Sequence, residues 1–190
     1  MSRTYSYHDF ETLYDKGLQR LDEFGEAPGD LASLKPDSST WSVREVYQHL
    51  IQFNGMYYGQ IQKVLGDEEP VIADNESFKP RLPFRFFISM LEPPYRVKFK
   101  TIAPMYPGDA DEKDPAKCLS RLKEINRKIF EKIRFVSEKS LDTDRMKGGN
   151  PVLQWVPMTL TEMLLIVDAH QRRHFLQIEK TFQKLSGESY

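Results

Sequence analysis

The last long apolar segment of the chain, residues 159–185, reads TLTEMLLIVDAHQRRHFLQIEKTFQKL. Its apolar side chains recur every three or four residues, which is the spacing of one face of an α-helix. The stripe consists of Leu160, Met163, Val167, His170, His174, Ile178, Thr181 and Leu185. Thr159 followed by Glu162 forms a capping box, in which each side chain bonds a free backbone N–H at the helix start. The segment therefore predicts a long helix that begins after Pro157 and points two histidines into the core.

Three further segments show the same apolar spacing and predict long helices. They span residues 10–24, 43–65 and 115–140. Ser42 and Glu45 form a second capping box at the start of the second segment. Asp114 and Pro115 mark the start of the third, because an acidic N-cap followed by proline suits the first helical turn. With little strand signal elsewhere, the sequence predicts an all-α bundle of four long helices.

The connection between residues 67 and 114 is the least regular part of the sequence. It is rich in proline, and a connection of that length usually carries structure or function of its own. Residues 84–91 are apolar enough for one short extra helix over an end of the bundle, stopped by the proline pair at 93–94. We expect residues 95–113 to form a loop.

Composition limits the location and the partners of the chain. Its 190 residues suit one helical domain over residues 1–190. The 27 basic and 28 acidic residues give a net charge of −1, which argues against nucleic acid or a membrane surface as a partner. The single cysteine, Cys118, excludes an intramolecular disulfide and a cysteine-built zinc cluster, and we expect it to be a small buried side chain. Since no secretory signal or long apolar run is visible, we expect a cytoplasmic protein.

Three of the four histidines fall at inward positions of the predicted helices. His170 and His174 lie about 40° apart on one face, because a helix advances about 100° per residue. His49 lies at the edge of the apolar face of the helix predicted over residues 43–65. Imidazoles four residues apart can share one ion, and a third from another helix leaves a further position open for water or a thiolate. The trio predicts a divalent metal site, with zinc or nickel preferred and iron or manganese as the alternatives.

The His-x-x-x-His spacing by itself is a weak signal, because two helical histidines are often satisfied by water or backbone carbonyls. Two neutral imidazoles buried side by side each need a hydrogen-bond partner, and a shared metal meets both needs. Because His49 adds a third imidazole, the sequence favours a metal site over histidines that are simply buried. Gln171 stands where the zinc peptidase pattern has its glutamate base, so peptidase chemistry of that type is excluded. His8 precedes the first predicted helix and is expected to be a surface histidine outside the site.

Further residues are candidates for roles around this site. Arg173 lies near the edge of the histidine face, and Tyr57 lies two turns beyond His49 with a hydroxyl to offer. Both are candidate substrate-binding residues. Asp168 and Glu179 are candidate orienters of the imidazoles, although charged helical residues usually face solvent. No catalytic acid, base or nucleophile is assigned.

Two motifs resemble those of a known family. Residues 41–50, WSVREVYQHL, resemble the helix start of the DinB-like (DinB/YfiT) superfamily, and residues 170–178, HQRRHFLQI, resemble its C-terminal His-x-x-x-His helix. The resemblance implies an antiparallel four-helix bundle with a long crossover and often a homodimer. It also implies a nickel or zinc site at His49, His170 and His174. Activities of the family include S-transfer with low-molecular-weight thiols, mycothiol-dependent isomerisation and metal-dependent hydrolysis.

Three functions stay open at this point, because a fold does not fix a function. The first is a metal-dependent enzyme of the thiol S-transferase or hydrolase type. It would act on a small-molecule substrate, and a low-molecular-weight thiol is one candidate. The second is a non-catalytic metal- or ligand-binding module of a stress response. The third is a helical interaction protein with buried histidines and no metal.

Overall fold

The computed structural model describes residues 3–27, 29–67, 69–93, 95, 106–108 and 112–187. Within them the chain forms five α-helices, one short 3-10 helix and a two-stranded sheet. The elements in chain order are α1 (Tyr7–Phe24), η1 (Leu31–Ser33), α2 (Val43–Asp67), α3 (Leu82–Leu91), α4 (Pro115–Glu138), β1 (Lys147–Gly149), β2 (Pro157–Thr159) and α5 (Leu160–Ser186). The protein is therefore mostly helical, as the apolar spacing predicts.

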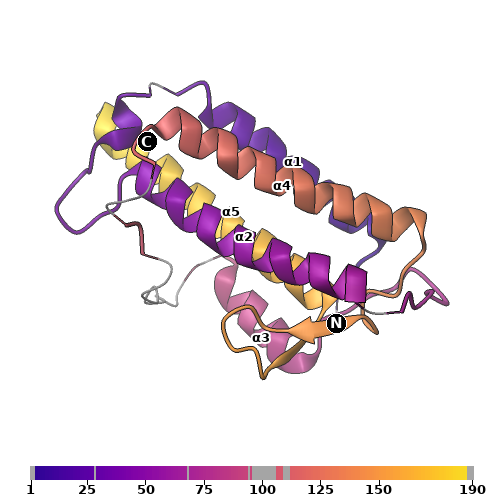
Figure 1. Cartoon of the computed structure of the whole chain (residues 1–190). Coiled ribbons are helices and arrows are strands. Elements are labelled where there is room, and N and C mark those ends of the chain that lie inside the picture. Colours follow the sequence, from indigo (N-terminus) through magenta and orange to yellow (C-terminus); the bar gives the residue numbers. More distant parts are fainter. Residues whose placement is uncertain are drawn as a thin grey trace.

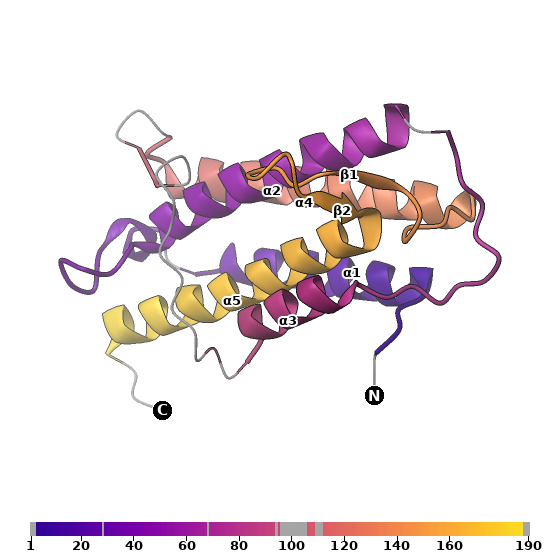
Figure 2. The ribbon, with the colours of Figure 1, turned by 90° about the horizontal axis from the view of Figure 1, so that it is seen from below.

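The four long helices form a bundle-like arrangement (Figure 1). α2 packs against both α4 and α5, and α1 packs against the same two helices. The shorter α3 lies alongside α5 (Figure 2). The contact between α2 and α5 matters most for the site, because each of these helices carries part of the histidine trio. Among the described helices, none combines the length and the apolar character that crossing a membrane requires.

Capping side chains determine where these helices begin. Thr159 accepts a hydrogen bond from the backbone N–H of Glu162, whose carboxylate accepts one from the backbone of Thr159. Ser42 and Glu45 bond in the same reciprocal way before α2. The side chain of Asp114 caps α4. The predicted starts of α2, α4 and α5 are thus confirmed, and with them the angular positions of the residues that follow. The first helix begins at Tyr7 rather than at residue 10, because Ser6 and Asp9 form a further capping box.

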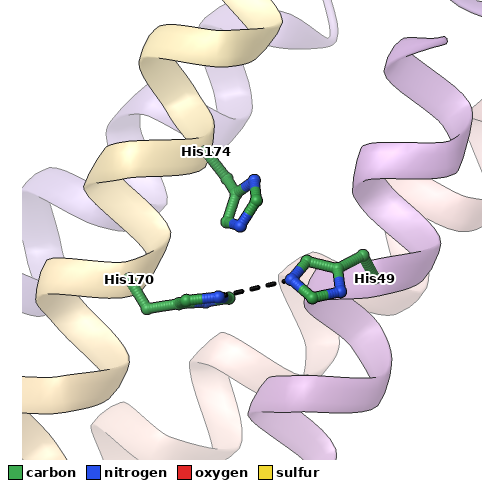
Figure 3. A group of neighbouring side chains, drawn as sticks. All are labelled: His49, His170 and His174. Carbon is green, nitrogen blue, oxygen red and sulfur yellow. Dashed lines mark hydrogen bonds between the residues drawn. The ribbon is translucent and has the colours of Figure 1, made fainter. Parts of the chain in front are cut away.

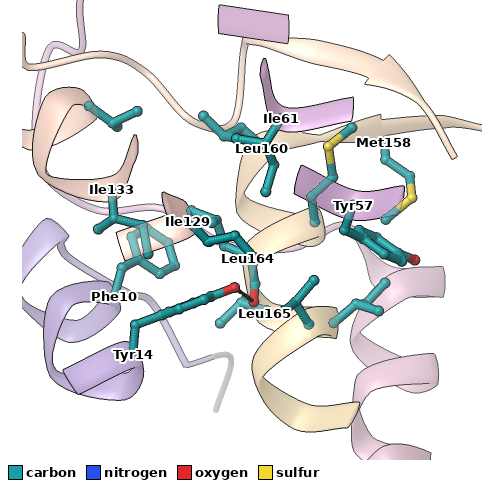
Figure 4. Packing of buried hydrophobic residues seen from close by; sticks show 14 of the residues in the cluster. Phe10, Tyr14, Tyr57, Ile61, Ile129, Ile133, Met158, Leu160, Leu164 and Leu165 are labelled. Carbon is teal, nitrogen blue, oxygen red and sulfur yellow. Dashed lines mark hydrogen bonds between the residues drawn. The ribbon is translucent and has the colours of Figure 1, made fainter. Parts of the chain in front are cut away.

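The buried apolar side chains form two clusters along the bundle. The larger one is shown in Figure 4, where the hydroxyl of Tyr14 also donates to the backbone oxygen of Leu164 at 3.0 Å. Each large side chain buried in this way stabilises the fold by about 1.5–3 kcal/mol. On α5, Ala169 belongs to the larger cluster and Phe175 to the smaller one. His170 and His174 lie between these two residues in the sequence, and therefore where the two clusters adjoin.

The strand pair is a feature that the sequence analysis did not predict. β1 and β2 pair in antiparallel fashion, with Gly148 opposite Met158. Strands of three residues are too short to show a period of two, so the all-α prediction holds for the helices but missed this sheet. A Cβ at Gly148 would lie 2.5 Å from a methyl carbon of Val64. Only glycine lets β1 lie this close to α2 without a shift.

Part of the connection between residues 67 and 114 packs on the bundle. Phe78 forms an isolated antiparallel bridge with Tyr5, which precedes α1 in the sequence. Arg81 donates to both carboxylate oxygens of Glu162, at 2.8 Å and 2.7 Å, and so joins the start of α3 to the start of α5. The short extra helix is confirmed as α3, although it begins at residue 82 rather than 84. It lies along α5 rather than over an end of the bundle (Figure 2).

The loop expected over residues 95–113 lies mostly outside the described residues. Its described positions, residues 95, 106–108 and 112–113, carry no helix or strand. The prediction of a loop therefore holds for these positions and stays a prediction for the others.

Candidate metal centre

The three inward histidines converge between α2 and α5 (Figure 3). His49 lies in the second turn of α2, and His170 and His174 lie one turn apart on α5. Each offers one ring nitrogen, and these nitrogens lie within 4.8 Å of one another. In Figure 3 the rings from the two helices point toward a common centre. The structure thus brings the predicted trio together, in a group that could hold a metal ion.

The spacing of the rings suits a shared ion. Nε2 of His49 lies 3.3 Å from Nε2 of His170. Two nitrogens bound at about 2.1 Å to a tetrahedral ion lie about 3.4 Å apart. The same separation also suits a long hydrogen bond between two imidazoles. This pair alone therefore does not distinguish a metal site from a hydrogen-bonded pair of histidines. The ring of His174 completes the group, with its centroid 4.6 Å from that of His49 and 4.5 Å from that of His170.

One hydrogen bond adds to the fit, and one buried nitrogen of the trio has no partner in the described part of the chain. Nδ1 of His174 lies 2.8 Å from Oε1 of Gln177, an oxygen that can only accept, so the proton is on Nδ1 and Nε2 keeps its lone pair. Nδ1 of His170 is buried and has no hydrogen-bond partner in the described part of the chain. An ion held between Nε2 of His170 and Nε2 of His49 would not reach this Nδ1, so the nitrogen is a position for a water.

The surroundings keep two of the imidazoles neutral. Burial lowers the pKa of His170 well below its usual 6.5, and the neighbouring His174 and His49 lower it further by repulsion. Burial, with repulsion from His49, holds the pKa of His174 at about 3. Neutral imidazole is the form that binds metal ions. Both side chains are therefore in the ligating protonation state at neutral pH.

A comparison with protein families tests the resemblance noted in the two motifs. A family model described as the DinB superfamily matches residues 10–178. This chain belongs to the DinB superfamily. The match runs from α1 into α5 and includes His49, His170 and His174, so the resemblance noted in the two motifs is confirmed. No curated protein and no solved structure matches the chain.

Aromatic rings enclose the histidines of this DinB-superfamily chain. Phe53, one turn after His49 on α2, stacks on His170 with ring centroids 3.7 Å apart and an angle of 16° between the planes. Trp41, just before α2, has its ring centroid 5.3 Å from that of His49. The sequence did not show that Phe53 stacks on His170 or that Trp41 lies beside His49. The positions of Trp41 and Phe53 on either side of His49 in the sequence were the available signal. That signal does not say how α5 packs against α2, and the stack on His170 depends on this packing.

Gln177 is a second residue that sequence reasoning missed. It lies three residues after His174, one turn along the same side of α5, and its amide oxygen faces the imidazole. A polar residue at this spacing from a candidate ligand is the usual place for a partner that fixes the tautomer. The pattern was present in the sequence, although many glutamines at that spacing simply face solvent.

The two predicted substrate-binding residues lie in different surroundings. Tyr57 is 3% exposed and stacks on Phe53 with centroids 4.8 Å apart, so Phe53 lies between it and His170. Burial raises the pKa of Tyr57 above its usual value. Arg173 is partly buried and donates to the backbone oxygen of Met90 at 3.2 Å. Tyr57 therefore packs in the core, and a substrate-binding role for either residue stays a prediction.

The candidate orienting carboxylates have other partners. Asp168 accepts a hydrogen bond from Arg172 at 2.9 Å, and Arg172 also donates to Glu92 at 2.8 Å. Glu179 pairs with Arg20 of α1. Asp168 and Glu179 thus each pair with an arginine. At His174 the orienting role expected of a carboxylate belongs to the side-chain amide of Gln177.

The remaining two predictions concern residues outside the site. His8 lies exposed and away from the trio, which confirms a surface histidine. It lies in the first turn of α1 rather than before the helix, because α1 begins at Tyr7. Cys118 is 1% exposed on α4, which confirms a small buried side chain. Neither residue belongs to the group that could hold an ion.

Proposed function

We propose that this chain is a metal-dependent enzyme of the thiol S-transferase or hydrolase type, with His49, His170 and His174 as the metal ligands. The observation that carries the proposal is the approach of three ring nitrogens to within 4.8 Å on two packed helices. Imidazoles gathered away from water cost free energy unless each nitrogen has a partner. An ion bound between the histidines would give a partner to the ring nitrogens that face one another.

The donor set supports zinc or nickel as the ion, with iron or manganese as the alternatives. Neutral imidazole suits zinc, nickel and iron, whereas manganese prefers carboxylate oxygens. Among the described residues the group consists of histidines alone. Manganese is therefore the weakest candidate.

Three histidine ligands leave room for a further ligand on a four-coordinate ion. When bound, a divalent ion would supply Lewis acidity that favours the deprotonated form of a thiol or of water beside it. The chain supplies the surroundings, because Gln177 fixes the tautomer of His174 and the rings of Phe53 and Trp41 lie against those of His170 and His49. We infer that the substrate is a small molecule.

The partners of the carboxylates favour thiol transfer over hydrolysis. Asp168 and Glu179, the acidic residues nearest the histidines along α5, are paired with Arg172 and Arg20. Hydrolysis gains from a carboxylate base that activates water, whereas a thiolate is itself the nucleophile. A low-molecular-weight thiol is therefore the first cosubstrate to test. A cytoplasmic location, which we also infer, would keep such a thiol reduced.

The antiparallel order of the four long helices and a homodimer belong to the same proposal, since both are what the family resemblance implies. Light scattering on the purified full chain distinguishes a dimer from a monomer. A monomeric protein would contradict the proposed dimer. It would not contradict the metal site, because all three histidines come from one chain.

A non-catalytic metal- or ligand-binding module is the second candidate function. It is favoured by the depth of His49, which is only 3% exposed. An ion held there for structure alone should raise the melting temperature strongly, because it binds the folded state only. Such an ion would have no ligand position that exchanges with small molecules.

The visible spectrum of the cobalt(II)-loaded chain tests the enzyme against the module. During titration with a small thiol such as cysteine, a thiolate-to-cobalt charge-transfer band would support an open position and the S-transferase type. A spectrum that stays unchanged with thiols and with azide would contradict the enzyme proposal. The His174→Ala variant is the control, since it lacks one ligand and should give neither the cobalt spectrum nor the response.

A further inference from the structure

A cavity of about 410 Å³ lies along the C-terminal half of α5. Its lining includes Thr40, Tyr95, Arg173, Gln177, Lys180 and Lys184. The members from α5 recur every three or four residues and therefore form one face of the helix. A volume of this size suits a small molecule.

Two contacts connect this cavity to the histidines. Gln177 lines the cavity and also bonds Nδ1 of His174 at 2.8 Å. Thr40 lines it from the segment before α2, and the ring of the next residue, Trp41, lies 5.3 Å from the ring of His49. The cavity therefore adjoins the histidine site through Gln177 on α5 and through the segment that precedes α2.

The lining of the cavity is positively charged. Arg173, Lys180 and Lys184 contribute three cationic groups, and none of the described residues around the cavity is acidic. Both lysines are exposed. Within the described part of the chain, neither lysine has a carboxylate partner. An anion could therefore bind here without displacing an ion pair of these lysines.

Other charges of α5 are neutralised by specific partners. Arg172, next to the cavity residue Arg173, pairs with Asp168 and Glu92. Glu179, the acidic residue beside Lys180, pairs with Arg20 of α1. The carboxylates of Asp168 and Glu179 on α5 are thus paired with arginines, and they do not balance the positive charge at the cavity.

We propose that the cavity binds the anionic group, a carboxylate or a phosphate, of the small molecule that reacts at the histidines. This inference rests on the proposed metal-dependent function. Lys180 lies about 9 Å beyond His174 along the helix axis, by their separation in the sequence, so one metabolite-sized molecule reaches both. The arginine and the lysines supply charge-assisted hydrogen bonds, and the hydroxyl of Tyr95 supplies a neutral one.

Isothermal titration of the full chain with inorganic phosphate and with succinate tests the proposal. Both zinc-loaded and chelator-treated protein are titrated, because the cavity residues are not the proposed ligands. We expect saturable binding of at least one probe in both states, and the probe that binds tells phosphate from carboxylate. The double variant K180Q/K184Q should weaken this binding by at least about tenfold.

The matched control is the double variant K63Q/K139Q, which removes the same charge from two exposed lysines on α2 and at the end of α4. Its affinity should stay within about twofold of the unmodified chain. Equal weakening in the two double variants would overturn the proposal, as would no saturable binding of either probe to the unmodified chain.

Two further outcomes separate this inference from the proposed function. Binding that needs zinc and ignores K180Q/K184Q would place the anion on the ion, which overturns the cavity proposal and leaves the metal proposal standing. Anion binding that K180Q/K184Q weakens, in a chain that takes up no divalent metal, would support the cavity as an anion site and overturn the metal proposal.

Discussion

Gln177 accepts a hydrogen bond from Nδ1 of His174 at 2.8 Å, and this bond leaves Nε2 of the imidazole with its lone pair. Partners of this kind orient a ligand ring and commonly change metal affinity by about 10–100-fold. Replacing Gln177 by alanine should therefore weaken zinc binding by at least about tenfold. Competition with a chromophoric chelator measures the affinity.

Two variants make the Gln177 prediction specific. Gln177→Glu keeps an acceptor oxygen and should bind zinc within a few-fold of the unmodified chain. Gln183→Ala removes an amide from the same helix away from the histidines and should have no effect. If Gln177→Ala and Gln183→Ala bind zinc equally well, the hydrogen bond has no role in metal binding.

Phe53 should stabilise the fold through the site that it covers. Its ring stacks on His170 at 3.7 Å and on Tyr57 at 4.8 Å, and the side chain is 8% exposed. Replacement by alanine leaves a cavity and should lower the free energy of unfolding by about 3 kcal/mol. Phe53→Leu, which keeps most of the volume, should cost about 1 kcal/mol. Urea denaturation of the metal-free protein measures both, and an alanine variant as stable as the leucine variant would argue against a packed ring.

The ion pair between Arg81 and Glu162 should hold α3 on the bundle. Glu162 has no exposed side-chain surface, whereas 42% of the Arg81 side chain is exposed. Replacing Arg81 by methionine leaves a buried carboxylate that keeps backbone hydrogen bonds from Thr159 and from residue 81, so the cost should be about 2 kcal/mol.

Thermal or urea unfolding checks the Arg81 prediction. Arg85→Met, which removes an exposed arginine from the same helix, is the control and should cost less than about 0.5 kcal/mol. The double variant R81M/E162Q should recover part of the loss, because it no longer buries an unpaired charge. No recovery in the double variant would contradict this account of the pair.

Acid should destabilise the metal-free protein through its histidines. Burial holds the pKa of His174 at about 3 and that of His170 well below its usual 6.5. As pH falls below about 6.5, the unfolded chain gains protons that the folded chain does not, so stability falls by about 1.4 kcal/mol per pH unit for each such imidazole. The loss continues until the folded state is protonated as well, near pH 3 for His174.

Urea unfolding between pH 7 and pH 4.5 measures this dependence, and the His174→Leu variant isolates the contribution of one imidazole. Its stability should fall less steeply with acid than that of the unmodified chain, by about 1.4 kcal/mol per pH unit. Equal slopes for the two proteins would mean that His174 is protonated in the folded state over this range.

The helix starts and the histidine face could be predicted because both depend on short stretches of sequence. The capping pairs at Ser42 and Thr159 act within one turn, and they place the residues that follow at known angles. The spacing of His170 and His174 then puts both on one face. For the same reason the bounds of α2 and α5 agree with the predicted segments to within a few residues.

Features that depend on contacts between distant segments could not be predicted. Arg81 and Glu162 are 81 residues apart, and no local pattern joins them. The stack of Phe53 on His170 requires the register of α2 against α5, which apolar spacing leaves open. β1 forms only because Gly148 lets the chain pass close to α2. Each of these is a property of packing rather than of a helix by itself.

The metal content of protein purified without a histidine tag tests the central claim most directly. After incubation with zinc or nickel and removal of the excess, the account predicts one ion per chain for the unmodified protein. The same content is expected for the His8→Ala variant, whose histidine is exposed and outside the group. His49→Ala, His170→Ala and His174→Ala should each lose most of the ion. An unmodified chain that stays metal-free with zinc, nickel, cobalt, manganese and iron(II), or ligand variants that hold as much metal as His8→Ala, would contradict the account.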